Sequence, residues 1–485
     1  MTEIFKNSKS ERTPVPVVII GNGPSGICLS YLLSGYTPYV KEGSVHPNPI
    51  LQRKLEEYPN VPVTQQDLEY LSEGLEGRSH SPVALLFDSL LRPDTDFIGD
   101  VDSVLSWKLE PERAIPHLVL GRGPPGGAWN AIEGSMITLS RGEWMGLPDL
   151  NFKDWMRMKR RNFRNDRSTA GDILNYYQHY VQSKGLQDNF VSGCVMSVVK
   201  INESAELDTL LHSHNECKEE ANQARTLFQV NGFLDDGCGS KQKFSIYAKN
   251  VVLATGTFDS PTWLGVHGED LPFVSHQISA LEEAVKSHRV HPNSDPVLII
   301  GAGLTAADAV LLAHHYNIPV IHSFRRRVND PALIFNQLPQ VMYPEYHKVH
   351  QMMKEQSIFG TGPYEGYISL PEHHAVSFHG DKKCIFRDKH GQHKVFGVSM
   401  VLILIGSNPN LSFLPNNGTH LALDIDQPVS PKRNPLDIDP ISYECVQEKS
   451  LYAVGPLAGD YFVRFVQGGA LASASSLMKS QKKPP

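Results

Sequence analysis

Two short apolar runs in the chain each lead directly into a glycine-rich turn. The first run covers residues 17–20 (VVII) before Gly21, and the second covers residues 297–300 (VLII) before Gly301. Continuous runs of this kind are typical of strands that are buried on both faces, as in a parallel sheet. A helical stretch rich in small residues follows each turn. The pattern therefore predicts two strand–turn–helix units that lie far apart in the chain.

The remaining pattern predicts further elements and two irregular segments. Residues 46–108 are rich in proline, leucine and acidic residues, which predicts helices and loops inserted after the second strand. Residues 202–225 are strongly polar, which predicts a surface excursion. Helices are expected at 27–33, 170–184 and 306–315, and strands at 37–41, 249–254, 319–324, 400–405 and 451–454.

Composition and charge limit the classes of protein to which the chain can belong. The chain has 485 residues, 40% of them apolar, and a net charge of −7, which argues against nucleic acid as a partner. The N-terminus lacks the apolar core of a secretory signal, and no apolar run approaches the roughly 20 residues of a membrane span. Six cysteines form no C-x-x-C pair, and adjacent histidine pairs cannot share a helix face, so no metal site is predicted. We expect a soluble intracellular protein of the cytoplasm.

The first turn, residues 21–26, reads G-x-G-x-x-G. Gly21 permits a tight turn, Gly23 lets the backbone approach a pyrophosphate, and Gly26 lets helix and strand pack closely. Pro24 and Ser25 complete the turn, and the Ser25 hydroxyl is interpreted as a donor to phosphate. Glu42 follows the strand predicted at 37–41, where an acid would accept hydrogen bonds from ribose hydroxyls. These features predict an FAD site.

The second turn is Gly301-Ala302-Gly303-Leu304-Thr305-Ala306, with Ala306 in the place of the third glycine. The strand that follows is succeeded by Arg325-Arg326-Arg327 rather than by an acid. Guanidinium groups at this position would pair with a 2′-phosphate, which favours NADPH over NADH. Opposite charges beyond two similar turns thus distinguish the FAD site from the NADPH site, although a solvated basic turn is the alternative for the triplet.

These features predict an α/β fold with two dinucleotide-binding, Rossmann-like domains, the NADPH domain being inserted in the FAD domain. The expected FAD domain covers residues 12–275, with an insertion at about 46–108, and closes with residues 399–480. The expected NADPH domain covers residues 290–398.

The motifs resemble those of class B flavin monooxygenases and N-hydroxylating monooxygenases. Residues 126–129 (GGAW) look like the turn along the flavin, and residues 253–256 (LATG) look like the end of the strand that joins the two domains. Within this group the chain is most similar to the oxidative stress-induced growth inhibitor family, nearest to the first of its two vertebrate paralogues. The resemblance is carried by residues 19–36, 67–79, 125–129, 304–310, 408–414 and 462–471.

The resemblance implies further residues of the FAD site. Gly127 and Trp129 would lie along the flavin, and Asp460 near its ribityl or pyrophosphate part. Thr255 and Gly256 would belong to the FAD site at the end of the strand that joins the two domains. Gly468 and Gly469 would open a final helix whose positive N-terminus faces the flavin pyrimidine. Residues 273–277 depart from the F-x-G-x-S-x-H motif of class B monooxygenases. Without that motif, NADPH oxidation would mostly release hydrogen peroxide.

The implied activity is an FAD- and NADPH-dependent monooxygenase that uses O2 and a small-molecule or protein substrate. The cofactors would carry the chemistry, so no catalytic side chain is named. The family further implies restraint of proliferation and promotion of cell death. Two alternatives remain. One is a flavin-binding regulator with little turnover that contacts protein partners through its insertions. The other is a reductase for a disulfide or quinone, although the absence of C-x-x-C disfavours the disulfide.

Overall fold

The computed structural model describes residues 13–93, 96, 101–132, 134, 136–159, 167–201, 227–235, 241–355, 364 and 366–481. The polar stretch predicted at 202–225 lies outside these residues. The chain divides into two compact units. The first comprises residues up to 257 together with those from 409 onward, and the second comprises residues 258–408.

A parallel sheet organises the first unit. Its five strands are β1 (Val15–Ile20), β4 (His117–Gly121), β7 (Phe190–Ile201), β9 (Lys241–Leu253) and β20 (Leu451–Ala453). They lie in the order β7-β4-β1-β9-β20, with every pair parallel. The antiparallel strand β8 (Leu227–Asp235) joins β7 to the first half of β9. The first strand is thus central, the order that places a ligand at its carboxyl end.

Strand β1 serves two hydrophobic cores, as its unbroken apolar run predicted. Val17 and Ile19 pack with the core of the helices, whereas Val18 and Ile20 pack with the core under β7, β8 and β9. Successive strand residues point to opposite faces, so a strand between two cores must be apolar at every position.

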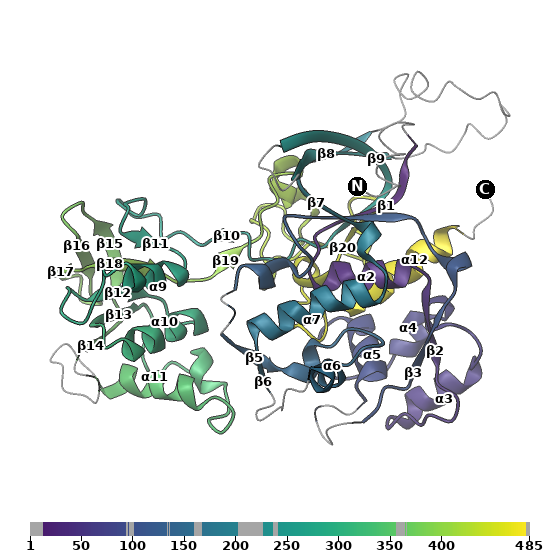
Figure 1. Ribbon diagram of the computed structural model, residues 1–485, viewed down its shortest axis with the longest axis horizontal. Helices are drawn as coiled ribbons and strands as arrows, with labels where there is room; N and C mark the ends of the chain where they lie inside the picture. The colour runs from purple at the N-terminus through teal and green to yellow at the C-terminus, as the bar shows by residue number, and fades with distance from the viewer. Residues whose placement is uncertain are drawn as a thin grey trace. The chain divides into compact units, whose positions relative to one another are not determined.

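Helices α2 (Pro24–Leu33), α7 (Ala170–Ser183) and α12 (Gly468–Gln481) gather on one side of this sheet (Figure 1). Pro24 stands at the start of α2, where its missing N–H costs no hydrogen bond. The Thr169 side chain caps α7 by accepting from the Asp172 N–H. The predicted helices at 27–33 and 170–184 are confirmed. Smaller elements of this unit are α6 (Phe152–Met158), β5 (Ile137–Arg141) and β6 (Arg167–Thr169).

The predicted insertion is largely helical, with α3 (Pro49–Glu57), α4 (Leu68–Ser72) and α5 (Pro82–Leu91). Its end differs from the prediction, because β3 (Leu105–Leu109) forms an antiparallel pair with β2 (Tyr36–Val40). Apolar side chains from all three helices enter the helical core. The insertion is therefore an integral part of the first unit.

The second unit has its own parallel sheet, in the order β11-β18-β12-β13-β14. Its central strand is again the one before the glycine turn. The strands are β11 (Val274–Ser275), β12 (Val297–Ile300), β13 (Val320–Phe324), β14 (Tyr367–Pro371) and β18 (Met400–Ile403). The predicted boundaries at 275, 290, 398 and 399 differ from those of the unit, since β11 and β18 both belong to this sheet.

Layers cover both faces of this sheet (Figure 1). Helices α10 (Leu304–His315) and α11 (Pro344–Glu355) contact β12, β13 and β14, and the short α9 (Ser279–Lys286) precedes β12. A second sheet of β15 (His374–Phe378), β16 (Lys383–Arg387) and β17 (His393–Gly397) shares a core with the other face. The chain enters through β10 (Ser260–Pro261) and leaves through β19 (Ser407–Asn408), which pair antiparallel.

Candidate functional site

Two backbone hydrogen bonds and two close backbone approaches hold the first glycine turn at the carboxyl end of the sheet. The Gly21 N–H donates to the Leu120 carbonyl at 2.8 Å, and the Ala254 N–H donates to the Ile20 carbonyl at 2.8 Å. Gly21 has φ +119°, and a Cβ on it would lie 2.2 Å from the Ala254 oxygen. A Cβ on Gly26 would lie 2.2 Å from the Gly21 oxygen. Only glycine therefore fits these two positions.

The second turn repeats these contacts with other residues. The Gly301 N–H donates to the Ser323 carbonyl at 2.9 Å, and the Leu404 N–H donates to the Ile300 carbonyl at 2.8 Å. Gly301 has φ +136°, and a Cβ on it would lie 2.3 Å from the Leu404 oxygen. The two turns are thus structurally equivalent, and Leu120 of β4 corresponds to Ser323 of β13.

The second glycine of each turn is not required by the backbone. Gly23 and Gly303 have φ −76° and −91°, which any residue adopts. A Cβ on Gly303 would meet nothing within 4 Å, and one on Gly23 would meet only the Gly127 Cα at 3.8 Å. Space is left open beside both glycines at a helix N-terminus, so both positions fit the close approach of a dinucleotide pyrophosphate.

The sequence predicted that Glu42 lies beside the first turn because it follows the strand after the first helix. The structure does not place that strand next to β1. Glu42 follows β2, which pairs with β3 and not with β1. The strand beside β1 is β4, and the residue that follows β4 is Arg122. Because Leu120 corresponds to Ser323, Arg122 corresponds to Arg325. Both turns are therefore followed by arginine, and the predicted contrast between an acid and a base does not exist.

Asn22 occupies the space at the end of β4. A Cβ on Gly121 would lie 2.2 Å from the Asn22 amide. The Asn22 Nδ2 group donates to the carbonyls of Gly123 at 2.8 Å and Pro124 at 3.1 Å, so both of its hydrogens are used. Its Oδ1 atom remains as an acceptor for a ribose hydroxyl. Sequence reasoning missed Asn22 and Arg122, although the run 117–121 just before the GGAW turn was a signal for this strand.

The G-G-x-W segment lies against the first turn. The Gly126 N–H donates to the Asn22 carbonyl at 2.9 Å. Gly127 has φ +57°, and a Cβ on it would lie 2.7 Å from the Gly23 Cα. Trp129 is half-buried in the short helix 127–130 and packs edge-on against Tyr177. The structure thus brings Gly127 beside Gly23 of the first turn, and Trp129 follows in the same short helix.

Thr255 and Gly256 also lie at this edge of the sheet. A Cβ on Gly21 would lie 2.9 Å from the Thr255 N atom, so the two residues are neighbours. The Thr255 Oγ1 atom is buried and has no hydrogen-bond partner among the described residues. Gly256 has φ +72° with open space beside it. An orphaned hydroxyl next to an open position fits a polar ligand at this place.

The Asp460 side chain points into the protein interior. Its carboxylate accepts from Tyr443 at 2.6 Å and from Ser81 at 2.8 Å, and the residue is 4% exposed. Burial raises the pKa of Asp460 to about 6, although the hydrogen bonds from Tyr443 and Ser81 lower it. Gly455, at the end of β20, lies against the Ser25 hydroxyl. The backbone of the closing segment therefore reaches the turn, whereas the Asp460 side chain binds the interior.

Gly468 and Gly469 begin α12, as predicted, and both are closely packed. A Cβ on Gly468 would lie 2.2 Å from the Ala84 Cα of α5, and one on Gly469 would lie 2.7 Å from the Tyr443 ring. The neighbouring Gln467 is buried, and its Oε1 atom has no partner among the described residues. Gly468 therefore permits close packing on the insertion, and Gly469 permits close packing on Tyr443.

The arginine triplet follows β13 in the second unit. Arg326 pairs with Asp330 at 3.1 Å, and Arg327 pairs with Glu372 at 3.1 Å. Arg325 is exposed and forms no ion pair with any described residue. Thr305 is exposed in the first turn of α10, and Ala306 is buried beneath it. Of the triplet, Arg325 is the residue whose charge is left for a phosphate.

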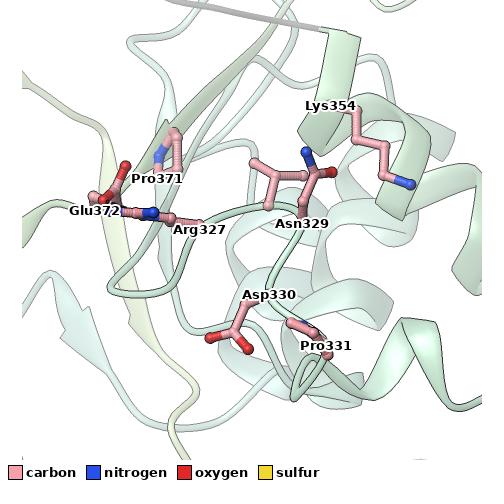
Figure 2. A pocket seen from close by; sticks show the side chains of 8 residues that line it. Arg327, Asn329, Asp330, Pro331, Lys354, Pro371 and Glu372 are labelled. Carbon is pink, nitrogen blue, oxygen red and sulfur yellow. Dashed lines mark hydrogen bonds and ion pairs between the residues drawn. The ribbon is translucent and has the colours of Figure 1, made fainter.

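A pocket of about 880 Å³ opens beside the triplet. Figure 2 shows Arg327 and Glu372 on one side of it and Lys354 of α11 on the other, with Asp330 and Pro331 between them. The pocket lies where the chain leaves β13 and β14, and ligands of open parallel sheets bind at the carboxyl ends of the strands. It therefore fits the adenosine end of a dinucleotide.

The buried side chain of His322 contacts the backbone of the second turn. Its Nε2 atom lies 2.6 Å from the Gly301 carbonyl, and its Nδ1 atom lies 2.8 Å from the Tyr367 hydroxyl. Burial lowers the pKa of His322 to about 4, so the ring is neutral at physiological pH. A neutral ring that donates to Gly301 must accept at Nδ1 from Tyr367, which sets a single tautomer.

The other candidate chemistries find little support in the described residues. Cys28, Cys384 and Cys445 are free and buried, and burial raises the pKa of each thiol, which disfavours the reactive thiolate. No group of three metal-ligating side chains occurs among the residues that the structure describes. Within the same residues, no helix is both long and apolar enough to cross a membrane.

The fold and the two equivalent turns define a structural class, the chains that combine two units of the dinucleotide-binding fold. The family model of the pyridine nucleotide-disulphide oxidoreductases matches residues 239–356. In fold, the chain is similar to a bacillithiol disulfide reductase from Bacillus cereus (TM-score 0.58, 15% identity, 96% of this chain and 100% of that one). It is also similar to the ornithine hydroxylase of Pseudomonas aeruginosa (TM-score 0.53, 13% identity, 97% and 100%).

Sequence relatives define the family. The chain is 63% identical to mouse oxidative stress-induced growth inhibitor 1, over 98% of each chain. It is 51% identical to human oxidative stress-induced growth inhibitor 2, over 96% of this chain and 94% of that one. The chain therefore belongs to the oxidative stress-induced growth inhibitor family, as the resemblance of its motifs indicated.

Proposed function

We propose that the chain is an oxidoreductase of the flavin monooxygenase type, with FAD in the first unit and NADPH in the second. The observation that carries the proposal is the equivalence of the turns at Gly21 and Gly301. Each is clamped by the same backbone contacts and leaves space beside its second glycine. Two such turns in one chain fit two dinucleotides.

Elements that only one turn possesses distinguish the two sites. Gly127, Trp129 and the orphaned Thr255 hydroxyl surround the first turn, and they would extend a site beyond the pyrophosphate toward a flavin ring. The second turn has instead the pocket beside Arg327. Arg325, the counterpart of Arg122, does not distinguish the two turns, but it forms no ion pair with any described residue. A guanidinium there would bind the 2′-phosphate of NADPH.

The chain's own residues would bind and orient the cofactors and exclude water from them. His322 would hold the second turn through Gly301, and Asn22 would accept from a ribose in the first. Hydride transfer and the activation of O2 would be supplied by the bound cofactors. The names of the relatives connect them with oxidative stress and growth inhibition, and we extend that role to this chain.

A matched pair of variants tests the proposal. Gly23→Ala and Gly303→Ala place one methyl group in the same position of each turn, at backbone angles that alanine adopts freely. We expect Gly23→Ala to lose bound FAD, measured by visible absorbance. We expect Gly303→Ala to keep the FAD and to bind NADPH at least about tenfold more weakly, or 1.4 kcal/mol.

Activity is measured on the wild-type protein. Anaerobic NADPH should bleach the yellow colour, and air should restore it, with NADH much slower. A yellow protein that ignores NADPH would instead be the regulator with little turnover. A colourless protein that takes up no FAD would refute the proposal.

A further inference from the structure

A chain of aromatic rings runs through the first unit from the G-G-x-W segment to the surface. It begins at Trp129, passes through Tyr177, Tyr176 and Tyr180 of α7, reaches Tyr31 of α2, and ends at Tyr36 and Trp107 of the β2–β3 pair. The ring centroids of successive members are 6.4, 5.5, 6.3 and 5.5 Å apart as far as Tyr31. Tyr31 lies 4.1 Å from Tyr36 and 5.3 Å from Trp107.

Packing alone does not require these hydroxyl groups. Tyr31, Tyr176, Tyr177 and Tyr180 are 0% exposed, and phenylalanine would fill nearly the same volume without a polar atom to satisfy. The loop at residues 145–150 instead supplies backbone carbonyls to the three tyrosines of α7. Tyrosine and tryptophan are the side chains that lose one electron most readily among the aromatics, and ring-to-ring contact permits the electron to move in short steps.

Tyr31 differs from the other buried tyrosines in its acceptor. Its hydroxyl donates to the Asp149 carboxylate at 3.1 Å, and the Lys184 Nζ atom lies 2.6 Å from that carboxylate. The backbone of Asp149 is in the left-handed region at φ +60°, a conformation in which aspartate is enriched. An oxidised phenol is a strong acid, so a carboxylate at hydrogen-bond distance accepts its proton as the electron leaves. A backbone carbonyl cannot do this.

We infer that these rings conduct oxidising equivalents between the first glycine turn and the surface, and that Tyr31 is the residue at which the missing electron settles. A one-electron oxidant, such as a photoexcited flavin or a radical derived from peroxide, takes one electron from Trp129. An electron from Tyr177 refills Trp129, and electrons from Tyr176 and Tyr180 follow in turn, while each of these three tyrosines keeps its hydroxyl proton. Tyr31 finally loses one electron, its O–H bond breaks, and the proton forms an O–H bond on Asp149.

The net change is one electron gained by the oxidant and one tyrosyl radical formed at Tyr31. A dissolved thiol gives up one electron through the half-buried Tyr36 or Trp107, which leaves a thiyl radical and releases the thiol proton to water, and Asp149 returns its proton to the Tyr31 oxygen. Such a path would draw a damaging oxidant away from the cofactor site. The place of the oxidant beside Trp129 rests on the proposed function, whereas the path itself does not.

The first experiment needs no flavin. Cofactor-free protein is oxidised in solution by flash-generated tris(bipyridine)ruthenium(III), freeze-quenched and examined by electron paramagnetic resonance. We expect a tyrosyl signal that Tyr31→Phe removes and that Asp149→Asn makes shorter-lived, because its proton acceptor is gone. Tyr39→Phe is the matched control. Its hydroxyl also donates to a carboxylate, that of Glu110 at 2.9 Å, but among the described residues its ring contacts no other aromatic ring. An unchanged signal in Tyr31→Phe, or an equal loss in Tyr39→Phe, overturns the inference.

The second experiment uses the FAD-loaded protein and tests the inner end of the path. Flavin excited-state decay should be slower in Trp129→Phe, and the tyrosyl signal after illumination should fall in Tyr177→Phe. Normal decay in Trp129→Phe would remove this residue from the path. A protein that binds no FAD would contradict the proposed function. The first experiment would still test the aromatic path, because it uses cofactor-free protein.

Discussion

At the residue scale, an arginine follows the strand beside each central strand, Arg122 after β4 in the first unit and Arg325 after β13 in the second. An acid at that position accepts from the ribose and repels a 2′-phosphate. With arginine there, the first site should not discriminate against a 2′-phosphorylated adenosine. The usual electrostatic difference between the two sites is therefore absent from this chain.

We expect 2′,5′-ADP to compete with FAD for the first site at least as well as 5′-ADP does. Arg122→Glu should weaken the competition by 2′,5′-ADP about 2- to 5-fold, the range that an exposed charge pair supplies. Competition is followed by flavin fluorescence in the Gly303→Ala background. Glu42→Gln is the control and should leave the affinity for FAD unchanged. A loss of FAD in Glu42→Gln would restore the role that the sequence predicted for it.

Asp460 makes stability depend on pH. Its pKa is raised by burial to about 6, against 3.8 for the free residue. The folded protein therefore binds more protons than the unfolded chain between these values, and stability falls as pH rises through this window. Above pH 6 the buried charge costs on the order of 3 kcal/mol.

Asp460→Asn keeps an acceptor for Tyr443 and Ser81 without the charge. We expect its free energy of unfolding to equal or exceed that of the wild type at pH 8. The advantage should disappear as the pH falls to 4. Urea unfolding at four pH values measures the difference, and a difference independent of pH would contradict the assigned charge.

At the element scale, a buried ion-pair cluster fastens the insertion to the closing segment. Arg464 is 4% exposed and pairs with Asp88 of α5 at 2.7 Å and with Asp96 at 2.8 Å. Its guanidinium also lies over the Trp144 ring at 5.1 Å. The cluster thus connects residues 88–96 to the segment that leads into α12.

Arg464→Met should lower the free energy of unfolding by about 3–5 kcal/mol, because it removes one of the two arginines that pair with the buried Asp88 and also breaks the pair with Asp96. Arg157→Met is the matched control. It breaks a pair of similar length, with Asp154 at 3.1 Å, in which both side chains are more than half exposed. Its expected cost is about 0–1 kcal/mol. Equal costs in chemical denaturation would show that the Arg464 cluster is not a clamp.

The sequence predicted individual strands and helices better than it predicted which strands pair with each other. The strands at 17–20 and 297–300 and the helix at 170–184 follow from local periodicity, which the structure confirms. The strand at 37–41 also exists, but periodicity cannot state which strand pairs with it. Because β2 pairs with β3, Glu42 does not follow a strand of the parallel sheet. The strand beside β1 is instead β4, which comes after the long insertion. The position of Arg122 therefore depends on contacts that no local pattern contains.

At the scale of the whole molecule, the second unit is one continuous segment with its own hydrophobic core. Ser260 and Asn408 are paired, so the two ends of the segment lie together. We expect residues 258–408 to fold alone, since no strand of either of its sheets comes from the first unit.

The isolated segment should unfold cooperatively in thermal circular dichroism and bind to immobilised 2′,5′-ADP. The same segment with Arg325→Ala should fold equally well and bind less. A segment that shows no cooperative transition would mean that its core is incomplete without the rest of the chain.

Because β10 and β19 are hydrogen-bonded to each other, the second unit begins and ends at one place and could be exchanged as a whole. A foreign nicotinamide module whose ends meet in a similar two-stranded ribbon could be grafted between Ser260 and Asn408. Neither the parallel sheet nor the aromatic rings of the host would need redesign. Preference for one pyridine nucleotide over another would then be a transplantable property in this family.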